Sequence, residues 1–190
     1  MEPNKDRLDS YEATPYVGFS LPDTHPDLLA SNARLFGLDP KDPSNCRVLE
    51  LGSGCGENLI PLADVLPNSQ FMGLDLSSTQ TETAKKNAAQ QKLSNIEFRC
   101  QDILAFELEG EPFDYIICHG VFSWVPAEFQ NAFLRIIQKR LTENGIAYIS
   151  YNTLPGWHEK LIVRDMMMAH ANGINDPGSR VAQARSFLQF

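Results

Sequence analysis

The sequence lacks several features that mark other classes of protein. No apolar run reaches the roughly 18 residues of a membrane span, and the polar N-terminus has no apolar segment of a secretory signal. The four cysteines form no CxxC pair, so the sequence carries no zinc signature. Basic residues are outnumbered by acidic ones, 16 against 24, which gives a net charge of −8. We therefore expect a cytoplasmic protein with no bound metal, no membrane span and no nucleic-acid partner.

The 190 residues include 43% hydrophobic and 21% charged side chains, a balance typical of a folded domain with a core. Near the N-terminus, Thr24 is the expected cap of a helix that Gly37 ends. Farther along, short apolar runs alternate with helical periodicity. The expected strands are 46–51, 70–74, 96–100, 113–119 and 146–151. This alternation predicts an α/β fold, a Rossmann-like doubly wound and mainly parallel sheet.

A glycine-rich turn, Gly52-Ser53-Gly54-Cys55-Gly56, follows the first expected strand and opens a helix. Glycines allow positive φ angles and let a ligand approach the backbone closely. The spacing is GxGxG rather than the dinucleotide pattern GxGxxG, and Glu57 stands in place of the third glycine. A carboxylate at a helix N-terminus competes with a pyrophosphate for the same positive site. The turn therefore favours a ligand without phosphates over the cofactor of a nicotinamide-dependent oxidoreductase.

Acidic residues stand at the ends of the first three expected strands. Glu50 either only stabilises the glycine turn by hydrogen bonds or also helps to position a cationic amino group of the ligand. Asp75 follows the second strand, where an acid can accept hydrogen bonds from both hydroxyls of a ribose. Asp102 follows the third strand and could accept from an adenine amino group. An adenosyl ligand with an amino group and no phosphate matches S-adenosylmethionine best.

Several segments resemble class I S-adenosylmethionine-dependent methyltransferases: VLELGSGCG, GLDLS, QDI, FDYIICHGVFSWVP and LTENGIAYIS. Three others are similar to a bacterial subgroup with a C-terminal methyltransferase regulatory domain, which includes rickettsial protein-lysine methyltransferases: SYEATPYVGFSLPDTHPDLLASNARLFGL, HGVFSWVP and SYNTLPGW. The resemblance implies about five strands here, with the family's C-terminal hairpin missing. It also implies a fragment of a longer protein, with an N-terminal arm (1–22), a cofactor-binding domain (23–172) and the start of a helical segment (173–190).

The resemblance further implies a cofactor site and a catalytic group, with S-adenosylmethionine as donor and S-adenosylhomocysteine as product. The expected cofactor contacts are Tyr16, Glu50, Gly52, Ser53, Gly54, Gly56, Asp75, Leu76, Asp102, Ile103, His119 and Gly120. The expected catalytic residues are His119, Tyr151 and Trp157.

The role of each expected catalytic residue stays open at this point. His119 is a candidate general base, a hydrogen-bonding residue in the wall of the site, or a purely structural residue. The side chains of Tyr151 and Trp157 either line an acceptor pocket or pack under loops. Methyl transfer by in-line displacement needs no metal, and the acceptor is a protein lysine or a small molecule. The alternative function is a non-catalytic S-adenosylmethionine-binding regulatory module.

Overall fold

The computed structural model describes residues 18–188, so the predicted contact of Tyr16 lies outside the described residues. The described residues divide into two compact units, 18–151 and 152–188. The first unit contains the sheet. The second contains α6 (His158–His170) and α7 (Pro177–Phe187), which pack against each other. The predicted boundary at 172 falls between these two helices, within the second unit.

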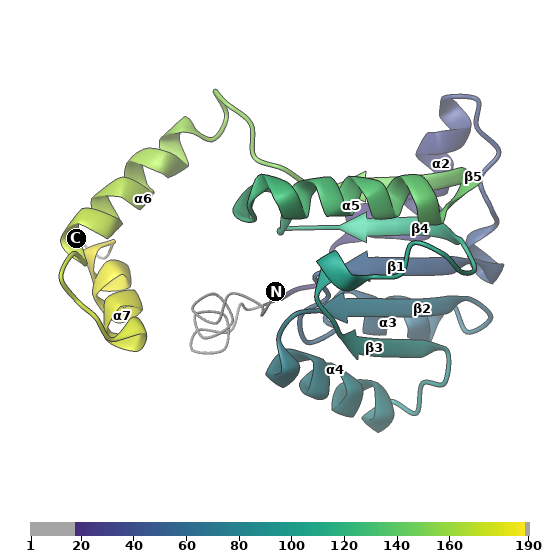
Figure 1. The fold of residues 1–190 in the computed structure, drawn as a ribbon, viewed down its shortest axis with the longest axis horizontal. Helices are drawn as coiled ribbons and strands as arrows, with labels where there is room; N and C mark the ends of the chain where they lie inside the picture. The colour runs from purple at the N-terminus through teal and green to yellow at the C-terminus, as the bar shows by residue number, and fades with distance from the viewer. Residues whose placement is uncertain (1–17, 189–190) are drawn as a thin grey trace. The chain divides into compact units, whose positions relative to one another are not determined.

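Within residues 18–188 the first unit contains one sheet of five parallel strands, in the order β3-β2-β1-β4-β5 (Figure 1). The strands are β1 (Arg47–Leu51), β2 (Gln70–Asp75), β3 (Ile96–Cys100), β4 (Phe113–Cys118) and β5 (Leu141–Ile149). This confirms the predicted α/β fold. The chain runs outward from β1 in one direction to β2 and β3, and in the other direction to β4 and β5. Open parallel sheets bind ligands beyond the carboxyl ends of their strands at the point where the strand order reverses in this way.

Helices cover both faces of this sheet because the central strands are apolar on both sides. In β1 the neighbouring Val48 and Leu49 are fully buried and belong to two separate apolar clusters. Figure 1 shows α5 in front of the strands and α3 behind them. The helices of this unit are α2 (Pro26–Leu35), α3 (Leu59–Val65), α4 (Ser78–Gln90) and α5 (Ala127–Arg140).

The fifth strand begins earlier than the sequence predicted. Instead of spanning 146–151, β5 begins at Leu141, directly where α5 ends at Arg140. The pairing with β4 changes register between Phe113 and Tyr115, which accommodates the additional residues. The polar stretch TENG at this start carries no strand-like apolar pattern, so this part of the strand could not be predicted.

The N-terminus of α2 also differs from the prediction. His25, not Thr24, is the N-cap, and its ring Nδ1 accepts a hydrogen bond from the Asp27 N–H at 3.1 Å. Thr24 is fully buried one residue earlier, in a 3-10 turn, η1 (Pro22–Thr24). Gly37 follows the helix with a φ of +82°, as the sequence predicted.

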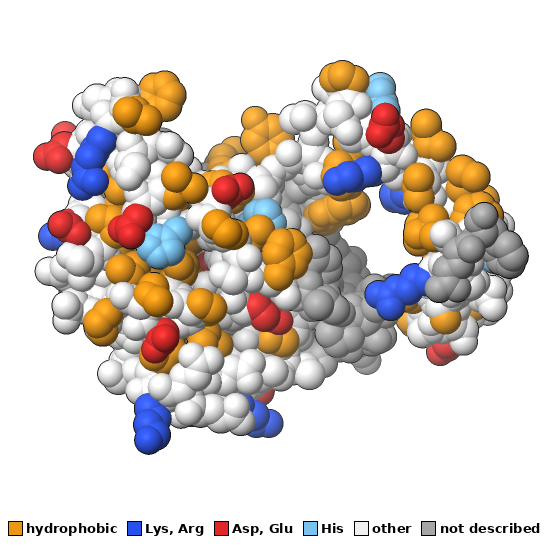
Figure 2. All heavy atoms as spheres, turned by 180° about the vertical axis from the view of Figure 1, so that it is seen from behind, with side chains coloured by type: hydrophobic (Ala, Val, Ile, Leu, Met, Phe, Trp, Pro, Cys, Tyr) orange, Lys and Arg blue, Asp and Glu red, His pale blue; other side chains and the backbone are white. Residues whose placement is uncertain are grey.

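The second unit carries exposed hydrophobic side chains, which Figure 2 shows gathered over α6 and α7. Ile162 is 61% exposed and Met166 is 50% exposed. The ring of His170 on α6 lies 5.1 Å from that of Phe187 on α7, centroid to centroid. Among the residues that the structure describes, no helix is long and apolar enough to cross a membrane.

Candidate active site

The glycine turn is held at the carboxyl end of β1 by the neighbouring strand. The N–H groups of Gly52 and Ser53 both donate to the carbonyl oxygen of Leu74, at 2.8 and 3.0 Å. Gly52, Gly54 and Gly56 all have positive φ angles, from +54° to +84°. A Cβ atom on Gly56 would lie within 3.0 Å of two buried side chains, so only glycine fits there. The backbone therefore forms an open cradle at the expected place.

Asp75 lies beside this cradle and fixes its shape. Its Oδ2 accepts from the Gly54 N–H at 2.8 Å, and its Oδ1 accepts from the Ser77 N–H at 2.9 Å. Each carboxylate oxygen keeps a second acceptor position. The carboxylate therefore shapes the glycine turn and can still accept bonds from a ligand.

The expected adenine-facing residues are at the same edge of the sheet. Asp75 at the end of β2 pairs in register with Cys100 at the end of β3, and the Leu76 carbonyl lies 3.5 Å from the Cys100 Sγ. Asp102 caps the following 3-10 turn, η3 (Ile103–Ala105), and its Oδ1 accepts from the Leu104 N–H at 2.9 Å. The pairing of β2 with β3 thus places Asp75, Leu76, Asp102 and Ile103 at neighbouring strand ends, and their contact with an adenosyl group stays a prediction.

Glu50 is buried at the end of β1, with only 4% of its surface exposed. Its Oε1 accepts from the Asn58 Nδ2 at 2.8 Å, whereas its Oε2 has no hydrogen-bond partner among the described residues. Burial raises the pKa of Glu50 to about 7, the Asn58 hydrogen bond opposes this rise, and the Glu57 and Asp75 carboxylates add to it. Asn58 is a site residue that the sequence analysis missed.

His119 follows β4, and the adjoining backbone is fixed by β5. The Gly120 N–H donates to the Ser150 Oγ at 2.8 Å, and the Ser150 N–H donates to the Cys118 carbonyl at 3.0 Å. Burial lowers the pKa of His119, while the Asp23 carboxylate opposes that shift. The ring Nδ1 is buried without a partner among the described residues.

The sequence analysis did not predict the environment of the His119 ring, which is formed by two aromatic rings and influenced by one carboxylate. The Phe19 ring meets it edge-on at 6.5 Å, and the Tyr148 ring stacks on it at 6.1 Å, both between centroids. Asp23 acts electrostatically on both His119 and Tyr148. Sequence periodicity could not reveal this group, since Phe19 and Asp23 come from the segment before α2 and Tyr148 from β5.

The other two predicted catalytic residues are Tyr151, at the end of the first unit, and Trp157, in the second. Tyr151 is 64% exposed, and its ring lies 6.5 Å from that of Phe122. Trp157 belongs to the second unit, where the Lys160 Nζ lies 4.4 Å from its ring centroid. Contact of these two side chains with an acceptor stays a prediction.

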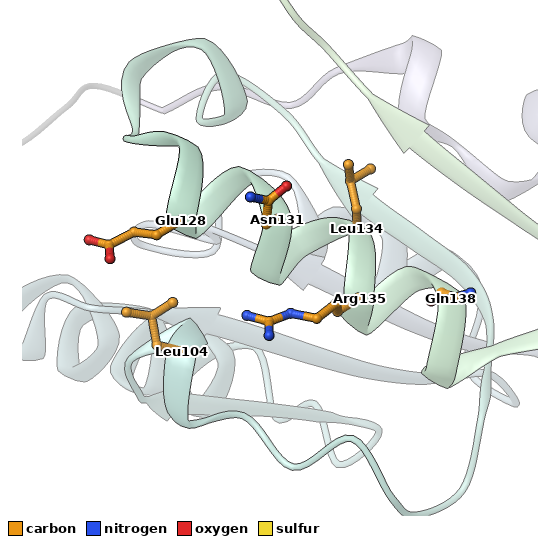
Figure 3. Close-up of a pocket in the computed structure, with 6 residues that line it drawn as sticks. All are labelled: Leu104, Glu128, Asn131, Leu134, Arg135 and Gln138. Atoms are coloured by element: carbon orange, nitrogen blue, oxygen red, sulfur yellow. The ribbon is translucent and has the colours of Figure 1, made fainter.

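A separate surface hollow of about 690 Å³ lies along the outer side of α5 (Figure 3). Figure 3 shows Arg135 extending from α5 toward Leu104 of η3. The residues that line the hollow are Leu104, Glu128, Asn131, Leu134, Arg135 and Gln138. No predicted cofactor or catalytic residue lines this hollow.

Comparison with known proteins decides the family. The model of a methyltransferase domain matches residues 42–183. The chain belongs to this methyltransferase family. Its methyl donor is S-adenosylmethionine, as the glycine cradle and the strand-end carboxylates predicted.

Relatives of the methyltransferase include two uncharacterized proteins of Rickettsia prowazekii (strain Madrid E). One is 41% identical over 95% of this chain and 72% of its own length, the other 43% identical over 95% of this chain and 32% of its own length. The crystallised PKMT2 from Rickettsia typhi, in complex with AdoHcy, is 42% identical with a TM-score of 0.83. That match covers 93% of this chain and 34% of PKMT2, so this chain spans about a third of that protein.

The residues of this methyltransferase fit the donor. The glycine cradle leaves the backbone accessible, and Asp75 keeps acceptor positions for ribose hydroxyls. The unpartnered Oε2 of Glu50 would pair with a cationic amino group, which would lower the cost of burying this carboxylate. Glu57 contributes a further negative charge at the start of the helix, consistent with a ligand that carries positive charge and no phosphate.

Replacing Asp75 tests the ribose assignment. We expect Asp75→Ala to weaken S-adenosylmethionine affinity by about ten- to a hundredfold, because bonds from the ribose to a charged acceptor are lost. Asp42→Ala is a matched control, since Asp42 Oδ1 also accepts from the N–H two residues ahead, at 2.9 Å. The control should leave affinity unchanged in a calorimetric titration. Equal affinity of Asp75→Ala and the native protein would contradict the assignment.

The buried Glu50 predicts how stability changes with pH. Its pKa rises from 4.5 to about 7 on folding, so the folded state binds this proton more tightly than the unfolded state. In the ligand-free protein, the contribution of Glu50 to the free energy of unfolding should therefore be greatest below pH 4.5. We expect this contribution to fall by roughly 3 kcal/mol as the pH rises to 7. Urea unfolding at several pH values measures this, and Glu50→Gln should remove the loss. The same pH dependence in both proteins would contradict it.

Proposed function

We propose that this chain transfers a methyl group from S-adenosylmethionine to the side-chain amine of a protein lysine. The observation that carries the proposal is the environment of His119: the Phe19 and Tyr148 rings lie beside its ring, and the Asp23 carboxylate acts on it electrostatically. Aromatic faces and a nearby negative charge both attract an ammonium group. The likeness to the rickettsial PKMT2 supports the same acceptor class.

The proposed reaction depends mainly on orientation. When bound, S-adenosylmethionine supplies a methyl group on a positively charged sulfur, ready for in-line displacement. The glycine cradle, Glu50 and Asp75 would hold the adenosyl and amino groups in place. The amine nitrogen forms the new N–C bond as the S–C bond breaks, with the electron pair of that bond left on sulfur.

A lysine ammonium must lose a proton before its nitrogen can attack, and His119 is the proposed base. Because burial lowers its pKa, the ring is mostly neutral at pH 7 and can accept a proton. The ring Nδ1, which has no partner among the described residues, can take up that proton or form a hydrogen bond. Tyr151 and Trp157 are further proposed contacts of the acceptor. We also propose that the full-length protein has a C-terminal regulatory region that acts as a partner of this domain.

Label transfer tests the acceptor class. The full-length protein is incubated with methyl-labelled S-adenosylmethionine and bacterial lysate proteins, either untreated or with their lysines acetylated. We expect label in the untreated proteins, recovered as methyl-lysine after hydrolysis, and none in the acetylated ones. Label in the small-molecule fraction alone, or equal label in both protein samples, would contradict a lysine acceptor.

The same assay tests whether His119 acts as a general base or only lines the site. His119→Asn should lower turnover at pH 7 by about a hundredfold, a typical contribution of a general base, while S-adenosylhomocysteine affinity stays within about twofold. Unchanged turnover would assign His119 to the wall of the site instead.

A further inference from the structure

Asn58 is the N-cap residue of α3, and asparagine is a favoured residue type there, yet its side chain makes no capping hydrogen bond. The side chain is buried, with 6% of the residue exposed. Its Nδ2 donates to Glu50 Oε1 at 2.8 Å, and its Oδ1 accepts from the Leu21 N–H at 3.0 Å. The Thr24 Oγ1 lies 3.1 Å from the same oxygen. One amide thus joins the end of β1 to the segment that precedes α2.

That segment lies against the site at several points. Gly18 is packed so closely on the Glu57 carboxylate that a Cβ atom there would lie 2.6 Å from it. The next residue, Phe19, meets the His119 ring. Asn58 therefore fixes the segment over the donor side of the site as well as the carboxylate beneath it.

We propose that Asn58 is a positioning residue for the methyl donor. By occupying Oε1 of Glu50 and anchoring Leu21, its amide leaves Oε2 as the oxygen that pairs with the amino group of the donor. This inference rests on donor binding and is independent of the acceptor. Without Asn58, the Glu50 carboxylate would lose its only hydrogen-bond partner among the described residues, and with it a fixed orientation.

The charges around Glu50 make this arrangement sensitive to pH. Glu57 and Asp75 act on Glu50 and favour its protonated form, the Cys118 thiol lies close enough to feel its charge, and Asn58 alone favours the carboxylate. Because only the ionised form attracts an ammonium group strongly, affinity for the amino-acid part of the donor should rise as Glu50 loses its proton.

Two ligands distinguish positioning from simple structural support. S-adenosylhomocysteine carries the amino group, whereas 5′-methylthioadenosine shares the adenosine and sulfur but lacks the amino acid. In calorimetric titrations of Asn58→Ala at pH 7 we expect about a tenfold loss of S-adenosylhomocysteine affinity, and a change within about twofold for 5′-methylthioadenosine. Between pH 6 and 8, the affinity rise of the native protein should move to higher pH in the variant.

Asn95→Ala is the matched control. Asn95 is also a buried amide, 7% exposed, and its Nδ2 bonds the carbonyls of Ala63, Leu66 and Ser69 away from the site. It should lose stability and keep both affinities. If Asn58→Ala does not fold, Asn58→Ser, too short to reach both partners, replaces it with the same expectation. Equal loss for both ligands, or no loss for either, would overturn the proposal, whereas a native protein that binds neither ligand would overturn the donor site itself.

Discussion

The burial of the Glu50 carboxylate is the constraint on which the rest of the site depends. A carboxylate at the end of a central strand, 4% exposed, is costly unless its oxygens have partners. One partner is the Asn58 amide, which also holds the segment before α2. The other oxygen has none among the described residues. The same carboxylate is therefore linked, through Asn58, to the start of α3 and to Leu21, and its other oxygen leaves a place for a cation.

The glycine turn begins two residues after Glu50 in the chain. Its N–H groups are divided between the Leu74 carbonyl and the Asp75 carboxylate, which ties the end of β1 to that of β2. Because the sheet is parallel and its order reverses at β1, the ends of β2, β3 and β4 all present their loops at one edge. The residues predicted to bind the methyl donor, after β2 and β3, and the proposed base after β4 thus share an edge while being far apart in sequence.

Much of this arrangement could be predicted from the sequence because its signals are local. Apolar runs such as YIIC, whose four residues are all fully buried, indicate strands covered on both faces, and the glycine spacing with Asp75 and Asp102 indicates an adenosyl ligand. Interactions between distant segments could not be predicted. Thr24 was predicted as a helix cap and Asn58 was not singled out, yet both side chains bond to partners that only the folded chain brings near. The start of β5 was missed because TENG is polar.

The central claim is that a glycine cradle surrounded by carboxylates selects a cationic adenosyl ligand that carries no phosphate. Calorimetric titration of the protein with S-adenosylmethionine and, separately, with NAD at pH 7.5 tests it most directly. We expect saturable one-to-one binding of S-adenosylmethionine and no heat of binding from NAD. Tighter binding of NAD than of S-adenosylmethionine would contradict it.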